Sequence, residues 1–205
     1  MAKFEGLGWI EAVKSIIVNP KDFFSNMSTD GGYEKPIVFA AINFVIVSLI
    51  TGILYFSYLS TFGGLFLNGP MPGFIPNIGL VGILAIPFMI VLSLVGGIIS
   101  LFVVAAISHV LLIIVGGKGS YEGTFRIVAY TTAFVLISWI PVLNILIGIY
   151  ALYVVLIGYS KIHEISKGRA LLGLLIPLLV ILAAVFSLIL FFGLSGIFGS
   201  FVPLV

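Results

Sequence analysis

Apolar residues fill this chain in blocks long enough to cross a membrane, and short polar segments separate the blocks. A spanning helix needs roughly 20 apolar residues to cross about 30 Å of hydrocarbon. Pro36–Leu59 is the first such block, and no Asp, Glu, Lys or Arg occurs between Pro36 and Gly117. The uncharged segment Thr61–Gly79 is rich in Gly and Pro, which predicts a loop on the membrane face or dipping into it.

The second block, Gly79–Val115, is too long for one upright span and short for two spans with a turn. As a single helix it would measure about 55 Å. A kink at Pro87 or a stagger above the bilayer would absorb the excess length. The alternative is a hairpin that turns at Gly96-Gly97.

The remaining apolar residues divide into three more spans. The sequence "SWIPVLN" contains Trp139, which suits a membrane interface, and Pro141, which interrupts a helix. We therefore divide the chain there. The three predicted spans are Thr124–Ile140, Val142–Ser160 and Ala170–Phe192.

The positions of Lys and Arg favour one long second span over a hairpin. They lie before the first span, in "GGKGSYEGTFR" and in "KIHEISKGR", whereas the other connecting segments and the tail have none. Positive residues favour the cytoplasmic side of a membrane. Five spans place all three basic groups inside, whereas a hairpin would turn the later groups outward. We therefore predict a multi-pass protein of the cell membrane with a cytoplasmic N-terminus and an external C-terminus.

The first 35 residues predict helices at the cytoplasmic membrane face. Trp9 lies on the apolar face of an amphipathic stretch from Gly8 to Val18, which fits a helix in the interface plane. Phe23 and Phe24, in "NPKDFFSNM", are expected to enter the headgroup boundary. These N-terminal helices either bind a partner or only anchor the first span. The predicted fold is an all-α integral membrane protein, with N-terminal interfacial helices in residues 1–35 and a five-span transmembrane helix bundle in residues 36–205.

Composition excludes several classes of function. Hydrophobic residues make up 61% of the chain and charged residues only 8%, whereas a soluble domain carries about 25% charged residues. The net charge of +2 and the absence of a basic patch with interleaved aromatic residues predict no nucleic-acid partner. The chain has no cysteine, and no His, Asp and Glu cluster has the spacing of metal ligands. We therefore expect no metal, no other cofactor and no enzymatic activity.

The few polar groups predicted at membrane depth form one candidate intramembrane cluster. Glu122 and Arg126 are four residues apart, so an ion pair on one helix face is expected. His109 and Tyr130 lie at similar distances from the turn at Gly119, which suggests a hydrogen bond across the two helices. Ionisable groups inside spans are often functional. The cluster is either a proton or anion site, or a set of residues satisfied within the bundle. Outside it, His163 is expected to be solvated at the interface.

Several segments together resemble the Yip (Ypt-interacting protein) domain family. They are "NPKDFFSNM", "GGYEKPIVFAA", "GGKGSYEGTFRIVAY" and the long stretch from "WIPVLN" to "LLGLLIP". The resemblance implies a five-span membrane domain with a cytoplasmic N-terminus. Eukaryotic members are associated with Rab-type GTPases and membrane traffic, and they usually carry a longer N-terminal region. The short region here resembles bacterial and archaeal members, so we do not expect a GTPase partner.

Two functional hypotheses follow from the sequence. The first is a non-enzymatic membrane-organising or trafficking-type adaptor, whose partners are the lipid bilayer and either further copies of itself or another membrane protein. The alternative is a small transporter or channel with a polar path near His109, Tyr130 and Arg126. A hydrated cavity that reaches these three residues would favour the alternative, and a dry interior would count against it.

Overall fold

The structure, a computed structural model, describes residues 8–67, 78–176, 179, 185–187 and 190. Every regular element in this part of the chain is a helix, as predicted. In chain order the elements are α1 (Trp9–Val18), α2 (Pro20–Ser25), α3 (Glu34–Leu67), α4 (Ile78–Ile114), α5 (Tyr121–Thr131), the 3₁₀-helix η1 (Thr132–Ile137) and α6 (Pro141–Ile162). Residues 167–176 form a further helical segment.

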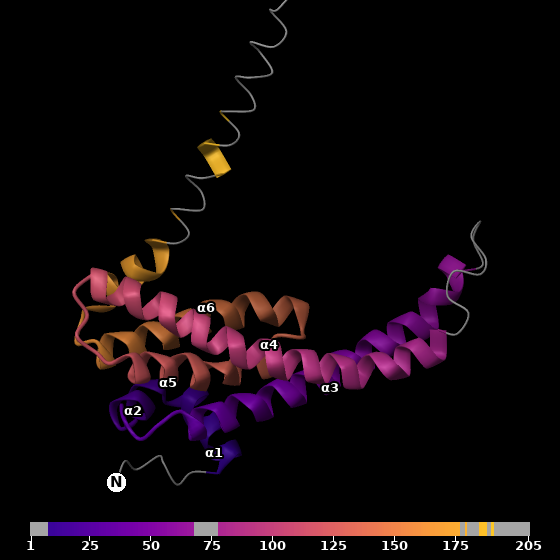
Figure 1. Cartoon of the computed structure of the whole chain (residues 1–205), viewed down its shortest axis with the longest axis horizontal. Helices are drawn as coiled ribbons and strands as arrows, with labels where there is room; N and C mark the ends of the chain where they lie inside the picture. Colours follow the sequence, from indigo (N-terminus) through magenta and orange to yellow (C-terminus); the bar gives the residue numbers. More distant parts are fainter. Residues whose placement is uncertain (1–7, 68–77, 177–178, 180–184, 188–189, 191–205) are drawn as a thin grey trace, which may run out of the picture.

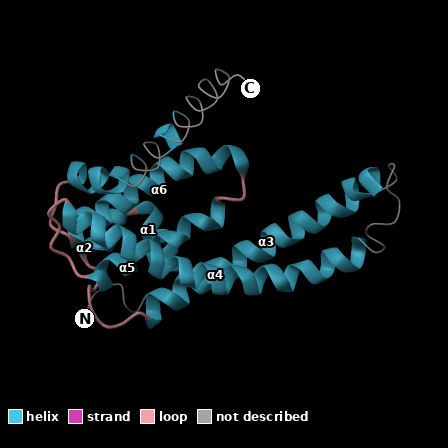
Figure 2. Ribbon diagram, turned by 45° about the horizontal axis from the view of Figure 1, so that its top comes forward, coloured by secondary structure: helices cyan, strands magenta, loops and turns pink. Residues whose placement is uncertain are grey.

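Helices α3 and α4 form a long antiparallel pair that projects from the rest of the molecule (Figures 1 and 2). At 1.5 Å per residue, their 34 and 37 residues measure about 51 and 55 Å. Helix α4 continues through Pro87, Gly96 and Gly97. The expectation of one long helix is therefore confirmed, and a hairpin at Gly96-Gly97 is excluded.

The two helices of this pair approach closely where a side chain is missing. A Cβ atom built on Gly97 would lie 2.6 Å from the ring of Phe44, whereas one built on its neighbour Gly96 would meet nothing within 4 Å. Gly97 thus provides the space that Phe44 of α3 fills. The predicted loop Thr61–Gly79 is shorter than expected, because α3 continues to Leu67; residues 68–77 of that prediction lie outside the described residues.

Three helices in the described part of the chain are long and apolar enough to cross a membrane: Glu34–Tyr58, Leu84–Ile114 and Pro141–Ile162. The predicted span Thr124–Ile140 is different, because it divides into α5 and the 3₁₀-helix η1. Most of its residues from Gly123 to Phe134 are buried against the other helices. Most of the predicted span Ala170–Phe192 beyond residue 176 lies outside the described residues.

The N-terminal helices form part of the packed core. Helix α1 packs against η1 and α5, and α2 packs against α6. Phe23 and Phe24, expected at the headgroup boundary, are instead 2% and 1% exposed, and their rings meet edge to face at 5.3 Å. Two large apolar rings gain more from complete burial in protein than from a mixed interface. Trp9, the third expected anchor, is only partly buried.

Candidate functional site

Glu122 and Arg126 form the ion pair that their spacing predicts. Ser120 caps α5, because its Oγ accepts a hydrogen bond from the backbone N–H of Gly123 at 3.0 Å. Two turns of this helix then present both charges on one face, and Nη2 of Arg126 lies 3.0 Å from Oε1 of Glu122. Arg126 does not extend toward the membrane surface, because its side chain is only 2% exposed.

The same ion pair holds the loop between α2 and α3. The backbone N–H of Gly32 donates to Oε1 of Glu122 at 2.7 Å, and Nη2 of Arg126 donates to the carbonyl of Gly32 at 2.9 Å. Gly31 and Gly32 have φ values of 107° and 87°, which favour glycine. One carboxylate and one guanidinium therefore attach a distant glycine turn to the first turns of α5.

His109 lies against Thr124, and not against Tyr130 as expected. Nδ1 of His109 is 3.1 Å from Oγ1 of Thr124. The ring of Tyr130 instead meets Phe23 and Phe39, each at a centroid distance of 5.2 Å. Thr124 and Tyr130 are six residues apart, so they occupy different faces of a helix with 3.6 residues per turn. The structure thus places Tyr130 in an aromatic cluster and His109 in a separate polar group.

Thr124 connects two histidines from different helices. Its Oγ1 also lies 2.7 Å from Nε2 of His163 and donates to the carbonyl of Ser120 at 3.1 Å. A hydroxyl has one proton and two lone pairs. When it donates to Ser120, it can accept from both imidazole rings. Under that arrangement, Nδ1 of His163 is left as an acceptor, and this buried atom has no hydrogen-bond partner in the described structure.

His163 is fully buried, contrary to the expectation of a solvated residue. The turn after α4 leaves room for this ring, since a Cβ atom built on Gly117 would lie 2.8 Å from Nδ1 of His163. Its carbonyl also accepts a hydrogen bond from the backbone N–H of Lys118 at 3.1 Å. Burial and, secondarily, the nearby His109 lower the pKa of His163 to about 4, so the ring is neutral at pH 7.

A second polar chain attaches α1 to the bundle. Nε1 of Trp9 donates to Oδ1 of Asn43 at 2.9 Å, and Nδ2 of Asn43 donates to Oγ1 of Thr132 at 2.9 Å. Asn43 is completely buried. An unpaired amide in such a position is costly, so each bond fixes the position of its helix.

The basic segments converge at one end of the bundle. The contact between Lys118 and His163 joins the turn after α4 to the end of α6, and Nη1 of Arg169 would lie 3.8 Å from a Cβ atom on Gly116 in that turn. The Glu122–Arg126 pair adds the loop that precedes α3. Residues from all three segments that carry Lys and Arg therefore lie at this end.

The predicted cluster thus divides into an ion pair and a histidine group, with Tyr130 in neither. Sequence reasoning missed the roles of Gly32, Thr124 and His163. Nothing in the charged segment "KIHEISKGR" marks His163 as buried. The described residues contain no group of three or more His, Cys, Asp or Glu that could hold a metal ion.

Comparison with known proteins supports the family resemblance. The family model of the Yip1 domain matches residues 14–199, which cover most of the chain. No curated protein and no solved structure matches the chain. The match includes the elements that carry both polar groups, from α3 to α6. This membrane protein with apolar helices therefore belongs to the Yip1 domain family.

Proposed function

We propose that this protein is a non-enzymatic membrane-organising or trafficking-type adaptor of the cell membrane. One observation carries the proposal: the buried side chains of Arg126 and Asn43 bind other parts of the same chain. Arg126 is occupied by Glu122 and Gly32, and Asn43 is occupied by Trp9 and Thr132. Such bonds fix the arrangement of the helices, which fits a structural role for these groups.

The topology that supports this role has five crossings. In it, α5 and η1 form the third crossing, since 11 α-helical and six 3₁₀ residues reach about 28 Å. An ionisable residue is tolerated in such a segment because it faces protein and not lipid. The convergence of the basic segments at one end supports a cytoplasmic N-terminus, and an external C-terminus then follows from the odd number of crossings.

The exposed face of α1 is the surface that we assign to a protein partner. Glu11, Lys14 and Val18 are exposed there, while Ala12 and Ile16 face the bundle. This surface places two opposite charges beside an apolar side chain, so it offers both ion pairs and apolar contact to a protein partner. The partner is another membrane protein or a second copy of this chain, and no GTPase is required.

Site-specific photocrosslinking in native membranes tests the adaptor function. A photoreactive residue at Lys14 should give one or a few discrete protein adducts. The same group at Ile145, which is 70% exposed on α6, should give lipid adducts only. If the two positions give the same products, the adaptor proposal is wrong.

A transporter remains a second candidate because of one specific feature. The string His109–Thr124–His163 links α4, α5 and the end of α6, and it leaves Nδ1 of His163 without a partner in the described structure. Such a string could carry a proton. Proton flux into liposomes that contain the full-length protein, lost in His109→Ala but kept in Tyr130→Phe, would favour this candidate. Flux equal to that of protein-free liposomes would exclude it.

A further inference from the structure

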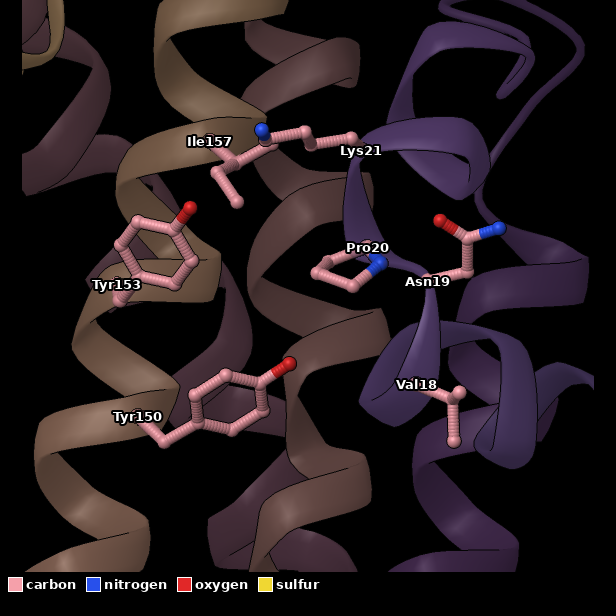
Figure 3. Close-up of a pocket in the computed structure, with 7 residues that line it drawn as sticks. All are labelled: Val18, Asn19, Pro20, Lys21, Tyr150, Tyr153 and Ile157. Atoms are coloured by element: carbon pink, nitrogen blue, oxygen red, sulfur yellow. The ribbon is translucent and has the colours of Figure 1, made fainter.

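A pocket of about 220 Å³ lies beside α6, where α1 ends and α2 begins (Figure 3). Its walls include Pro20 and Lys21 from the N-terminal helices and Tyr150, Tyr153 and Ile157 from α6. The hydroxyl groups of both tyrosines point toward the junction of α1 and α2, and Lys21 extends across toward α6. The pocket thus combines apolar walls with a few polar atoms from two separate parts of the chain.

The polar lining of this pocket suits an anion. The hydroxyl of Tyr150 donates to the carbonyl of Ile17 at 2.7 Å, which holds α1 against α6. In the described structure, the hydroxyl of Tyr153 has no hydrogen bond and the ammonium of Lys21 has no ion pair. No Asp or Glu lines the pocket. A cation and a hydroxyl with unused donors, and no competing carboxylate, match the oxygens of a phosphate.

A second cation, which does not line the pocket, lies over the ring of Tyr153. Nζ of Lys167 lies 4.9 Å from the centroid of the Tyr153 ring, within the range of a cation–π interaction. Lys167 is exposed. The contact therefore places a second positive charge beside Tyr153. The pocket and the ring that lines it thus carry charges from α2 and from the segment after α6.

The apolar surface beside the pocket favours a phospholipid over free phosphate as the occupant. Toward its N-terminal end, α6 exposes Ile145, Leu146 and Ile149 by 64–70%, which is typical of contact with lipid chains. Tyr150 and Tyr153 follow this surface along α6, and their hydroxyl groups are polar tips that a lipid phosphate can bond. We propose that the pocket binds the phosphate of an anionic phospholipid, with the acyl chains along this face of α6. The proposal requires the membrane location but not the adaptor function.

Lipid binding to the full-length protein in detergent tests the proposal directly. Native mass spectrometry would compare phosphatidylglycerol with phosphatidylcholine of the same acyl chains. We expect phosphatidylglycerol to bind about tenfold more tightly, and Lys21→Ala to remove most of that difference, as loss of one charge-assisted contact predicts. Tyr153→Phe, which keeps the ring beneath Lys167, should weaken phosphatidylglycerol binding about threefold.

Lys118→Ala is the matched control, because Lys118 is exposed in the turn after α4 and does not line the pocket. It should change the affinity for phosphatidylglycerol less than about twofold, since a surface charge outside the pocket is screened. An equal loss in Lys118→Ala and Lys21→Ala would show general surface attraction and overturn the site. Displacement of the lipid by millimolar inorganic phosphate would overturn the lipid as the occupant.

A measurement on the unchanged protein covers the case in which a variant does not fold. Phosphatidylglycerol with a photoreactive acyl chain would be crosslinked to the wild type in detergent, and the modified peptides would be mapped. Adducts between residues 145 and 157 of α6, reduced by excess phosphatidylglycerol but not by phosphatidylcholine, support the proposal. Adducts confined to the α3–α4 pair, or reduced equally by both lipids, contradict it.

Discussion

Arg126 donates to Glu122 and, through the same Nη2 atom, to the carbonyl of Gly32, which lies 94 residues earlier in the chain. This relationship makes a local ion pair into a link between the N-terminal loop and α5. Removing one partner of a buried pair leaves an uncompensated charge or an unsatisfied group. The consequences of this link, and of the other contacts described above, can be measured.

Arg126→Ala should lower the free energy of unfolding in mixed micelles by about 3–5 kcal/mol, because Glu122 and the Gly32 carbonyl lose their shared donor. Arg169→Ala is the control, since Arg169 is exposed, and it should cost less than about 1 kcal/mol. Similar losses in the two variants would show that Arg126 is not a structural link.

Gly97→Ala should lower the free energy of unfolding by about 1–3 kcal/mol, because the added methyl group would overlap the ring of Phe44. Gly96→Ala, one residue earlier on the same helix, should be neutral or slightly stabilising, since its Cβ would meet nothing and alanine favours a helix. Thermal unfolding in detergent compares them. A stable Gly97→Ala with an unstable Gly96→Ala would mean that the α3–α4 interface lies on another face.

Trp9→Phe should cost about 1–3 kcal/mol, because Oδ1 of the buried Asn43 loses its donor. It should also speed proteolysis of the N-terminal helices, which that bond attaches to α3. Trp139→Phe, at a position 39% exposed, should leave both readouts unchanged. If Trp9→Phe does not speed cleavage, the polar chain does not hold α1 in place.

Protein stability should decrease between pH 6.5 and pH 4 because of His163. Its pKa is about 4 in the folded protein and about 6.5 in an unfolded chain. In this window the unfolded state binds more protons, so unfolding becomes easier as the pH falls. The full effect is about 3 kcal/mol. His109 from α4 and Tyr159 from α6 are the titratable groups whose rings face His163.

His163→Gln is the comparison variant for this pH dependence. Glutamine keeps a group that can bond to Thr124 but does not titrate. The melting temperature of the wild type should fall more steeply than that of His163→Gln from pH 6.5 to pH 4. Parallel curves for the two proteins would place the acid sensitivity elsewhere.

Much of the helical architecture was predictable from the sequence, because long apolar blocks cannot be soluble and charges mark their ends. The unbroken helix through Gly96 and Gly97 followed from the arrangement of Lys and Arg, although glycine pairs often mark turns. The division of Thr124–Ile140 into α5 and η1 was not predictable. That segment packs against other helices. A helix buried in protein and a helix that faces lipid are both apolar, so hydropathy alone does not show where the α-helix ends.

The candidate site was predictable only where its residues are close in sequence. The Glu122–Arg126 pair follows from helical spacing, whereas Gly32 joins it through tertiary contacts. We predicted the His109–Tyr130 contact from the depth of each residue along its helix. Depth does not show the direction in which a side chain points around the helix axis, and Tyr130 points elsewhere. His163 was missed because a charged neighbourhood predicts exposure, and the glycine at position 117 that makes room for it looked like an ordinary turn residue.

The five-crossing topology that we propose requires the three basic segments to lie on the cytoplasmic face of the membrane. The chain has no cysteine, so single cysteines can be introduced at Ser28, Lys118 and Lys167 and labelled with a membrane-impermeant maleimide. With this topology, all three cysteines should react in inverted vesicles and none should react in intact cells. Labelling of any one of them from outside intact cells, with the other two protected, would contradict it.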